Sequence, residues 1–93
     1  MENRPDEAEF RAWLLARLGE YLERPVEDLD TAVPFAESGL DSVAALSLCG
    51  DIEDAYGLVL EPTVVWDHPT VAALSRHLCA CAAVAARPAP GAH

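Results

Sequence analysis

One stretch of this 93-residue chain decides its fold, Ser42-Val43-Ala44-Ala45-Leu46-Ser47-Leu48-Cys49-Gly50-Asp51-Ile52-Glu53-Asp54-Ala55-Tyr56-Gly57. Its apolar side chains recur at the spacing of one buried helix face, at Ala45, Leu48, Cys49, Ile52 and Tyr56. A glycine directly after such a pattern commonly forms the left-handed residue that ends a helix. The stretch therefore predicts a helix from about Ser42 to Tyr56, ended by Gly57.

Helical spacing also occurs on both sides of this stretch. A first helix is predicted from Asp6 to about Glu23, with an apolar stripe of Phe10, Leu14, Leu18, Tyr21 and Leu22. A last helix is predicted from Pro69–Thr70 to about Ala85, with a stripe of Val71, Leu74, Leu78 and Cys81. Asp67 and Thr70 are candidates for the cap of this last helix.

The two remaining segments are shorter or less regular. Pro62–Trp66 is an apolar piece of one or two helical turns, and no other segment resembles a partner that would make it a strand. Pro25–Asp41 has neither helical nor strand spacing, and we expect a long loop anchored to the core by Val26, Leu29, Val33 and Phe35. The chain is thus predicted to be all-α, a four-helix bundle of three longer helices and a short third helix, with the long loop between the first two helices.

The acidic charge of the chain is concentrated in its centre. Sixteen Asp and Glu against six Arg give a net charge of −10, and residues 25–75 contain ten of these acids and no Lys or Arg. Such a surface repels nucleic acids and anionic membrane surfaces, so neither is an expected partner. No apolar run reaches the ~20 residues of a membrane span.

The same composition bears on compartment and domain boundaries. The N-terminus has no apolar signal-peptide core, and three cysteines without framework spacing fit reduced thiols, so we expect a cytoplasmic monomer. The predicted domain spans residues 6–86, between a disordered N-terminus at 1–5 and a flexible tail at 87–93.

The densest local signal is Glu37-Ser38-Gly39-Leu40-Asp41-Ser42-Val43. It places a serine at the predicted start of a helix, where free backbone N–H groups and partial positive charge would stabilise an attached phosphate. Asp or Ser at this place is also a common helix cap, and on residue chemistry alone capping is the commoner explanation. A second apolar strip on the same helix, formed by Val43, Leu46 and Gly50, is equally well explained as ordinary exposed surface.

These segments together resemble the acyl carrier proteins of fatty-acid and polyketide synthesis. Gly39-Leu40-Asp41-Ser42-Val43 is similar to the attachment sequence of that family for 4′-phosphopantetheine. Ile52-Glu53-Asp54-Ala55-Tyr56-Gly57 resembles the end of its second helix, and Leu60 to Thr70 resembles its third helix and the start of its fourth. The resemblance covers about residues 8–80 with the spacing preserved, and includes the long first loop.

The resemblance implies a carrier rather than an enzyme. Ser42 would be modified by a phosphopantetheinyl transferase that takes the group covalently from coenzyme A, and the prosthetic thiol would then hold acyl groups as thioesters. Asp41 would assist recognition by the transferase, Gly39 and Leu40 complete the motif, and Val43 and Leu46 would border the arm. A tethered substrate has a high local concentration at each partner's active site.

The expected partners follow from the same resemblance. They are the transferase, an acyl-loading enzyme (an acyltransferase or an acyl-adenylating ligase), and ketosynthase or condensation-type enzymes with basic docking patches. Leu46, Ser47, Asp51 and Asp54 are the predicted docking residues. Ser47 stands where the family often has Glu, and Cys49 and Asp51 stand where modular polyketide carriers often have Arg. The second helix is therefore all-acidic, like that of discrete carriers that dock on basic patches.

Several alternatives stay open at this point. The residues Val43, Cys49 and Trp66 resemble stand-alone carriers that start lipopeptides. A peptidyl carrier of a non-ribosomal peptide synthetase would more often begin its motif Gly-Gly, and a helical protein-interaction module without modification would need none of these residues.

Two further site types are weakly supported. Ser42, Asp67 and His68 contain the residue types of a hydrolase triad, but the Gly-x-Ser-x-Gly elbow is missing. His77, Cys79 and Cys81 would need side chains two residues apart on a helix to share one metal ion, which their opposite directions disfavour. No metal site is predicted.

Overall fold

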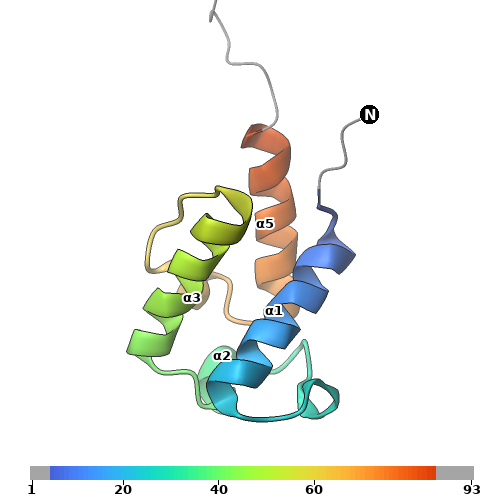
Figure 1. Ribbon diagram of the computed structural model, residues 1–93, viewed down its shortest axis with the longest axis vertical. Coiled ribbons are helices and arrows are strands. Elements are labelled where there is room, and N and C mark those ends of the chain that lie inside the picture. Colours follow the sequence, from blue (N-terminus) through green and yellow to red (C-terminus); the bar gives the residue numbers. More distant parts are fainter. Residues whose placement is uncertain (1–4, 86–93) are drawn as a thin grey trace, which may run out of the picture.

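The helices of the protein are arranged as a small bundle in the computed structural model, which describes residues 5–85 (Figure 1). The three longer helices are α1 (Glu7–Leu22), α3 (Ser42–Tyr56) and α5 (Val71–Ala85). Between them lie the 3₁₀ turn η1 (Val26–Asp28) and the short helices α2 (Phe35–Ser38) and α4 (Val64–Asp67). No strand occurs within residues 5–85. The predicted all-α class is confirmed, and α2 is an additional short helix inside the predicted loop.

Parts of the predicted boundaries cannot be compared with this structure. Residues 1–4 of the predicted disordered N-terminus and the whole predicted tail, residues 87–93, lie outside the described residues, as does residue 86 at the end of the predicted domain.

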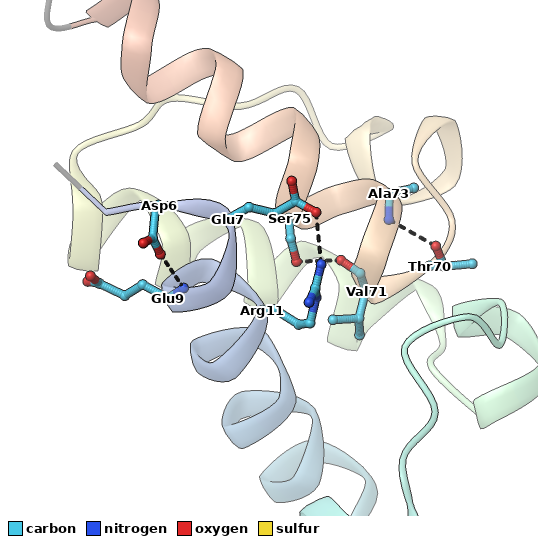
Figure 2. Close-up of polar contacts among 8 residues, drawn as sticks. All are labelled: Asp6, Glu7, Glu9, Arg11, Thr70, Val71, Ala73 and Ser75. Atoms are coloured by element: carbon cyan, nitrogen blue, oxygen red, sulfur yellow. Dashed lines mark hydrogen bonds and ion pairs between the residues drawn. The ribbon is translucent and has the colours of Figure 1, made fainter.

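Side-chain caps fix where the first and last helices begin. Asp6 Oδ1 accepts a hydrogen bond from the amide of Glu9 at 2.8 Å, which caps α1. Thr70 Oγ1 accepts one from the amide of Ala73 at 3.0 Å, so Thr70 is the capping residue of the two that were candidates at α5 (Figure 2). Each cap satisfies a backbone N–H that has no partner inside the helix.

The core lies where the three longer helices meet. Its most completely buried side chains come from α1, α2, α3, α4 and α5, and are Phe10, Leu14, Phe35, Leu48, Ile52, Val65, Leu74 and Leu78. These include the central residues of every predicted stripe, so the helical spacing in the sequence did identify the buried faces. Burying a side chain of this size stabilises the fold by about 1.5–3 kcal/mol.

The long first connection is tied to the start of α5. Phe35 is 1% exposed, and its amide donates to the carbonyl of Pro69 at 2.7 Å. The amide of Ala72 donates to the carbonyl of Thr31 at 3.0 Å. Leu29 packs against the core, but Val26 is exposed, so the prediction that Val26 anchors this loop is wrong. Val26 lies in η1, whose single turn buries none of its side chains.

Two histidines stack where α4 is followed by α5. The rings of His68 and His77 lie 4.0 Å apart between centroids, with an angle of 16° between their planes. Burial lowers the pKa of His77, and the neighbouring His68 lowers it further, while Asp67 opposes both effects. Two stacked imidazoles cannot both be protonated without repulsion. The folded state therefore binds the His77 proton less readily than the unfolded state does.

This arrangement predicts an acid-dependent loss of stability. The contribution of neutral His77 is complete above its unfolded-state pKa of about 6.5 and is lost as the pH falls through that value and through the lower pKa of the folded state. Urea unfolding between pH 7.5 and 5 should show a steeper fall in the free energy of unfolding for wild type than for His77→Gln. Equal pH dependence in the two proteins would contradict the assignment.

Candidate functional site

The segment before α3 is held in one conformation. The short helix α2 ends at Gly39, whose φ of 101° lies in the left-handed region that favours glycine. The next residue, Leu40, is buried, and its amide donates to the carbonyl of Phe35 at 3.1 Å. Gly39 therefore permits the turn and Leu40 anchors it to the core, so the residues that follow have a fixed position.

Asp41 is the capping residue of α3. Its Oδ1 accepts a hydrogen bond from the amide of Ala44 at 2.8 Å, and its carbonyl accepts one from the amide of Ala45 at 2.9 Å. Ser42 is the first residue of the helix, and its side chain is exposed. Capping thus explains Asp41, but it leaves the Ser42 hydroxyl unused.

The start of α3 also offers a favourable site for negative charge. The first amides of a helix have no partner within it, and Asp41 satisfies that of Ala44. The amides of Ser42 and Val43 remain for an external acceptor, at the positive end of the helix dipole. An anionic group joined to the Ser42 oxygen would lie beside these two N–H groups.

The outward face of α3 carries the second apolar strip. Val43 is 73% exposed and Leu46 is 54% exposed, and Ser47 and Gly50 are exposed as well. Further along the helix, Glu53 and Asp54 are exposed acids. The face is therefore apolar near Ser42 and acidic towards its far end.

Asp51 differs from the other predicted docking residues because its carboxylate is engaged within the molecule. Asp51 Oδ2 lies 3.1 Å from Arg17 Nη2 of α1 and also accepts a hydrogen bond from the Tyr21 hydroxyl. Arg17 Nη1 lies 3.2 Å from Glu20. Burial raises the pKa of Tyr21, and the bond to Asp51 raises it further, so the phenol stays a donor at neutral pH.

The sequence indicated no role for Arg17, and it placed Tyr21 only in the apolar stripe of the first helix. They are four residues apart and so share one side of α1. Asp51 follows more than thirty positions later, and no local pattern indicates which side of α1 would meet α3. Arg17 lies outside residues 25–75, yet it pairs with an acid of that stretch.

The alternative constellations do not assemble in the part of the chain that the structure describes. No hydrogen bond there joins the Ser42 hydroxyl to a histidine, and the His68 ring stacks on His77 instead. Among residues 5–85 no group of three or more His, Cys, Asp or Glu could hold a metal ion. His77 Nε2 lies 3.4 Å from Cys81 Sγ, one turn along the same helix, and Cys49, Cys79 and Cys81 are all free thiols.

Comparison with known proteins gives a consistent result. Residues 12–78 match the family described as "PP-binding: Phosphopantetheine attachment site". Polyketide synthase PksM of Bacillus subtilis is 38% identical over 69 residues, which cover 74% of this chain and 2% of the synthase. The chain thus spans only a small part of the curated relatives it matches.

Solved structures of similar fold include separate and excised carriers. A free-standing peptidyl carrier protein from Acinetobacter baumannii superposes with a TM-score of 0.80 at 38% identity, covering 83% of this chain and 96% of that protein. An A1-type ACP domain from module 5 of MLSA1 has a TM-score of 0.70 at 37% identity, covering 77% and 73% of the two chains. Within the described residues, no helix is long and apolar enough to cross a membrane.

The cap at Asp41 makes a testable contribution to stability. Asp41→Ala removes the acceptor for the Ala44 amide and should lower the free energy of unfolding by about 0.5–2 kcal/mol, whereas Asp41→Asn keeps an acceptor oxygen and should lose a fraction of that. Urea unfolding of the three proteins measures both effects. An Ala variant as stable as wild type, or an Asn variant as damaged as Ala, would show that Asp41 does not cap α3.

Proposed function

This chain belongs to the phosphopantetheine-attachment family of carrier proteins, and from that premise we propose that Ser42 is the residue to which its 4′-phosphopantetheine is joined. The family carries its cargo on this group and is not catalytic. One observation supports the choice of residue above the others: Asp41 caps α3, so the exposed hydroxyl of Ser42 is free at the positive end of the helix.

The other serines of the chain are less suitable. Ser38 is half-buried and its hydroxyl donates to the carbonyl of Pro34 at 3.5 Å. Ser75 is fully buried and donates to the carbonyl of Val71, as Figure 2 shows. Ser47 is exposed but lies inside α3, where the backbone amides already have helical partners. Ser42 alone combines exposure with a helix N-terminus.

The residues around Ser42 fit a phosphodiester in this position. The amides of Ser42 and Val43 are available to its oxygens, and Gly39 and Leu40 hold the turn that exposes the hydroxyl. When bound, the group supplies a terminal thiol that holds cargo as a thioester. The contribution of the chain is to fix one end of the arm on a rigid helix, so that the cargo stays at high local concentration for each partner.

We propose that partners dock on the outward face of α3. Val43 and Leu46 supply apolar contact beside the arm, and Ser47 and Asp54 continue the surface along the helix. The excess of acids from residue 25 to residue 75 is complementary to basic patches on a phosphopantetheinyl transferase, an acyl-loading enzyme, and ketosynthase or condensation-type enzymes. The fourth predicted docking residue, Asp51, is instead paired with Arg17 of α1.

Acyl cargo in a polyketide pathway is the function we favour. The match to a polyketide synthase supports it, as does the motif Gly39-Leu40-Asp41-Ser42. The second candidate is a peptidyl carrier, because a free-standing peptidyl carrier has the same 38% identity as the synthase and is matched over 96% of its own chain. Fatty-acid and lipopeptide pathways rest on the sequence resemblance alone. A cytoplasmic location is proposed with them, on the free thiols of all three cysteines.

The assignment of Ser42 predicts a specific mass change. After incubation with coenzyme A and a broad-specificity phosphopantetheinyl transferase, wild type should gain the mass of one phosphopantetheine and Ser42→Ala should gain none. Ser47→Ala is the matched control, since it removes the other exposed hydroxyl of α3, and at the end point of the reaction it should have gained the same mass as wild type. Intact-protein mass spectrometry gives all three results.

Two outcomes would refute the proposal. One is an unmodified wild type under conditions that modify a known carrier. The other is a Ser42→Ala protein that gains as much mass as wild type. A separate measurement distinguishes the two candidate functions. The mass of the cargo on the protein isolated from its own cells shows whether that cargo is an acyl or an aminoacyl group.

A further inference from the structure

We propose that Arg17 of α1 decides which carboxylates of α3 a basic partner can contact. By pairing with Asp51, it withdraws that residue from docking and leaves Glu53 and Asp54 as the contacts. The proposal rests on the attachment of phosphopantetheine at Ser42 and on docking at α3, and it adds a specificity-determining residue outside that helix.

The pairing is well formed and partly shielded. Arg17 and Asp51 are 33% and 30% exposed in their side chains, and Nη2 and Oδ2 are 3.1 Å apart. The Tyr21 hydroxyl donates to the same oxygen, and the Arg17 guanidinium carbon lies 5.8 Å from the centre of the Tyr21 ring. Asp51 Oδ2 therefore already has two donors from α1 before any partner approaches.

The helix geometry separates Asp51 from the two open acids. Each residue turns an α-helix by about 100°, so Asp51 and Glu53 lie on nearly opposite edges of the outward face of α3, with Asp54 between them. The contacts of Asp51 place its edge against α1, which lies beside α3 in Figure 1. Glu53 and Asp54 are exposed. On the side nearest α1, the docking face therefore ends at Asp51, whose charge is compensated by Arg17.

The size of the effect follows from the charges involved. A partner cation about 4 Å from an exposed carboxylate gains on the order of 1 kcal/mol in water-like surroundings. Near Asp51 the same cation is also repelled by Arg17 from a similar distance, so the attraction to Asp51 and the repulsion by Arg17 largely cancel. Among the described residues Asp54 forms no ion pair. A difference of about 1 kcal/mol corresponds to about a fivefold difference in association.

Glu20 reduces the effect of the Arg17 charge at longer range. It also pairs with Arg17, so the sum of Glu20, Arg17 and Asp51 is still one negative charge, and the general attraction of the acidic surface is kept. The partner that fits therefore has Arg or Lys at the acidic end of α3 and apolar side chains opposite Val43 and Leu46.

The proposal is tested by a double-mutant cycle on transfer of phosphopantetheine to Ser42. The rate at low carrier concentration is measured with coenzyme A and a broad-specificity transferase at 0.15 M salt, where steering beyond about 8 Å is screened. Asp54→Asn should slow transfer about fivefold and Asp51→Asn less than twofold. With Arg17→Gln already present, Asp51→Asn should slow transfer as much as Asp54→Asn does.

Matched variants control for charge and folding. Arg11→Gln removes the same charge from α1 at the separate Arg11–Glu7 pair drawn in Figure 2, and it should leave the rate unchanged. Arg17→Lys keeps the charge and should behave as wild type. Circular dichroism checks that each variant is folded. If Arg17→Gln does not fold, the comparison is made with Arg17 in place. A smaller effect of Asp51→Asn than of Asp54→Asn then supports the proposal, and equal effects overturn it.

The failures are distinguishable. Equal effects of Asp51→Asn and Asp54→Asn in the wild-type background would overturn the role of Arg17, as would an Asp51→Asn effect that is the same with and without Arg17. An Arg11→Gln variant that changes the rate as much as Arg17→Gln does would also overturn it, because net charge alone would then explain both. Absence of transfer to wild type would instead refute the attachment at Ser42.

Discussion

Burial of the inner face of α3 is the constraint on which the rest of the structure depends. Leu48 and Ile52 are fully buried between the other helices, and together they fix the rotation of α3 about its axis. A rotation by one residue would turn the helix by about 100°, exposing one of them and burying a polar neighbour at a cost of a few kcal/mol. The outward position of Val43, Ser47 and Asp54 is therefore a consequence of core packing.

A second constraint sets where along the chain this helix begins. Gly39 makes the turn, Leu40 is anchored in the core, and Asp41 caps the helix, so the next residue lies exposed in its first turn. The cap and the proposed attachment site are compatible because they fall on two adjacent residues, Asp41 and Ser42. Residue chemistry alone leaves open whether this motif is a helix cap or a modification site. In the structure Asp41 caps the helix, and the neighbouring Ser42 is left free for the proposed modification.

Local patterns in the sequence predicted most of the fold and the start of a helix at Ser42. The stripes of α1, α3 and α5 repeat at helical spacing, and burial of Phe10, Ile52 and Leu74 confirms them. Long-range contacts were not predictable in this way. Whether Val26 faces the core depends on how the first connection crosses the bundle, and the pairing of Arg17 with Asp51 depends on how α1 packs against α3. Neither of these contacts produces a periodic pattern in the sequence.

The most direct measurement is to locate the modification on the protein. A Glu-specific protease should release residues 38–53 of the modified protein, because Glu37 and Glu53 flank a stretch without other glutamates, and this peptide contains Ser38, Ser42 and Ser47. Fragmentation by tandem mass spectrometry then identifies the serine that carries phosphopantetheine. The structure predicts Ser42 alone. Phosphopantetheine on Ser38 or Ser47 would contradict the account of how the start of α3 forms the attachment site.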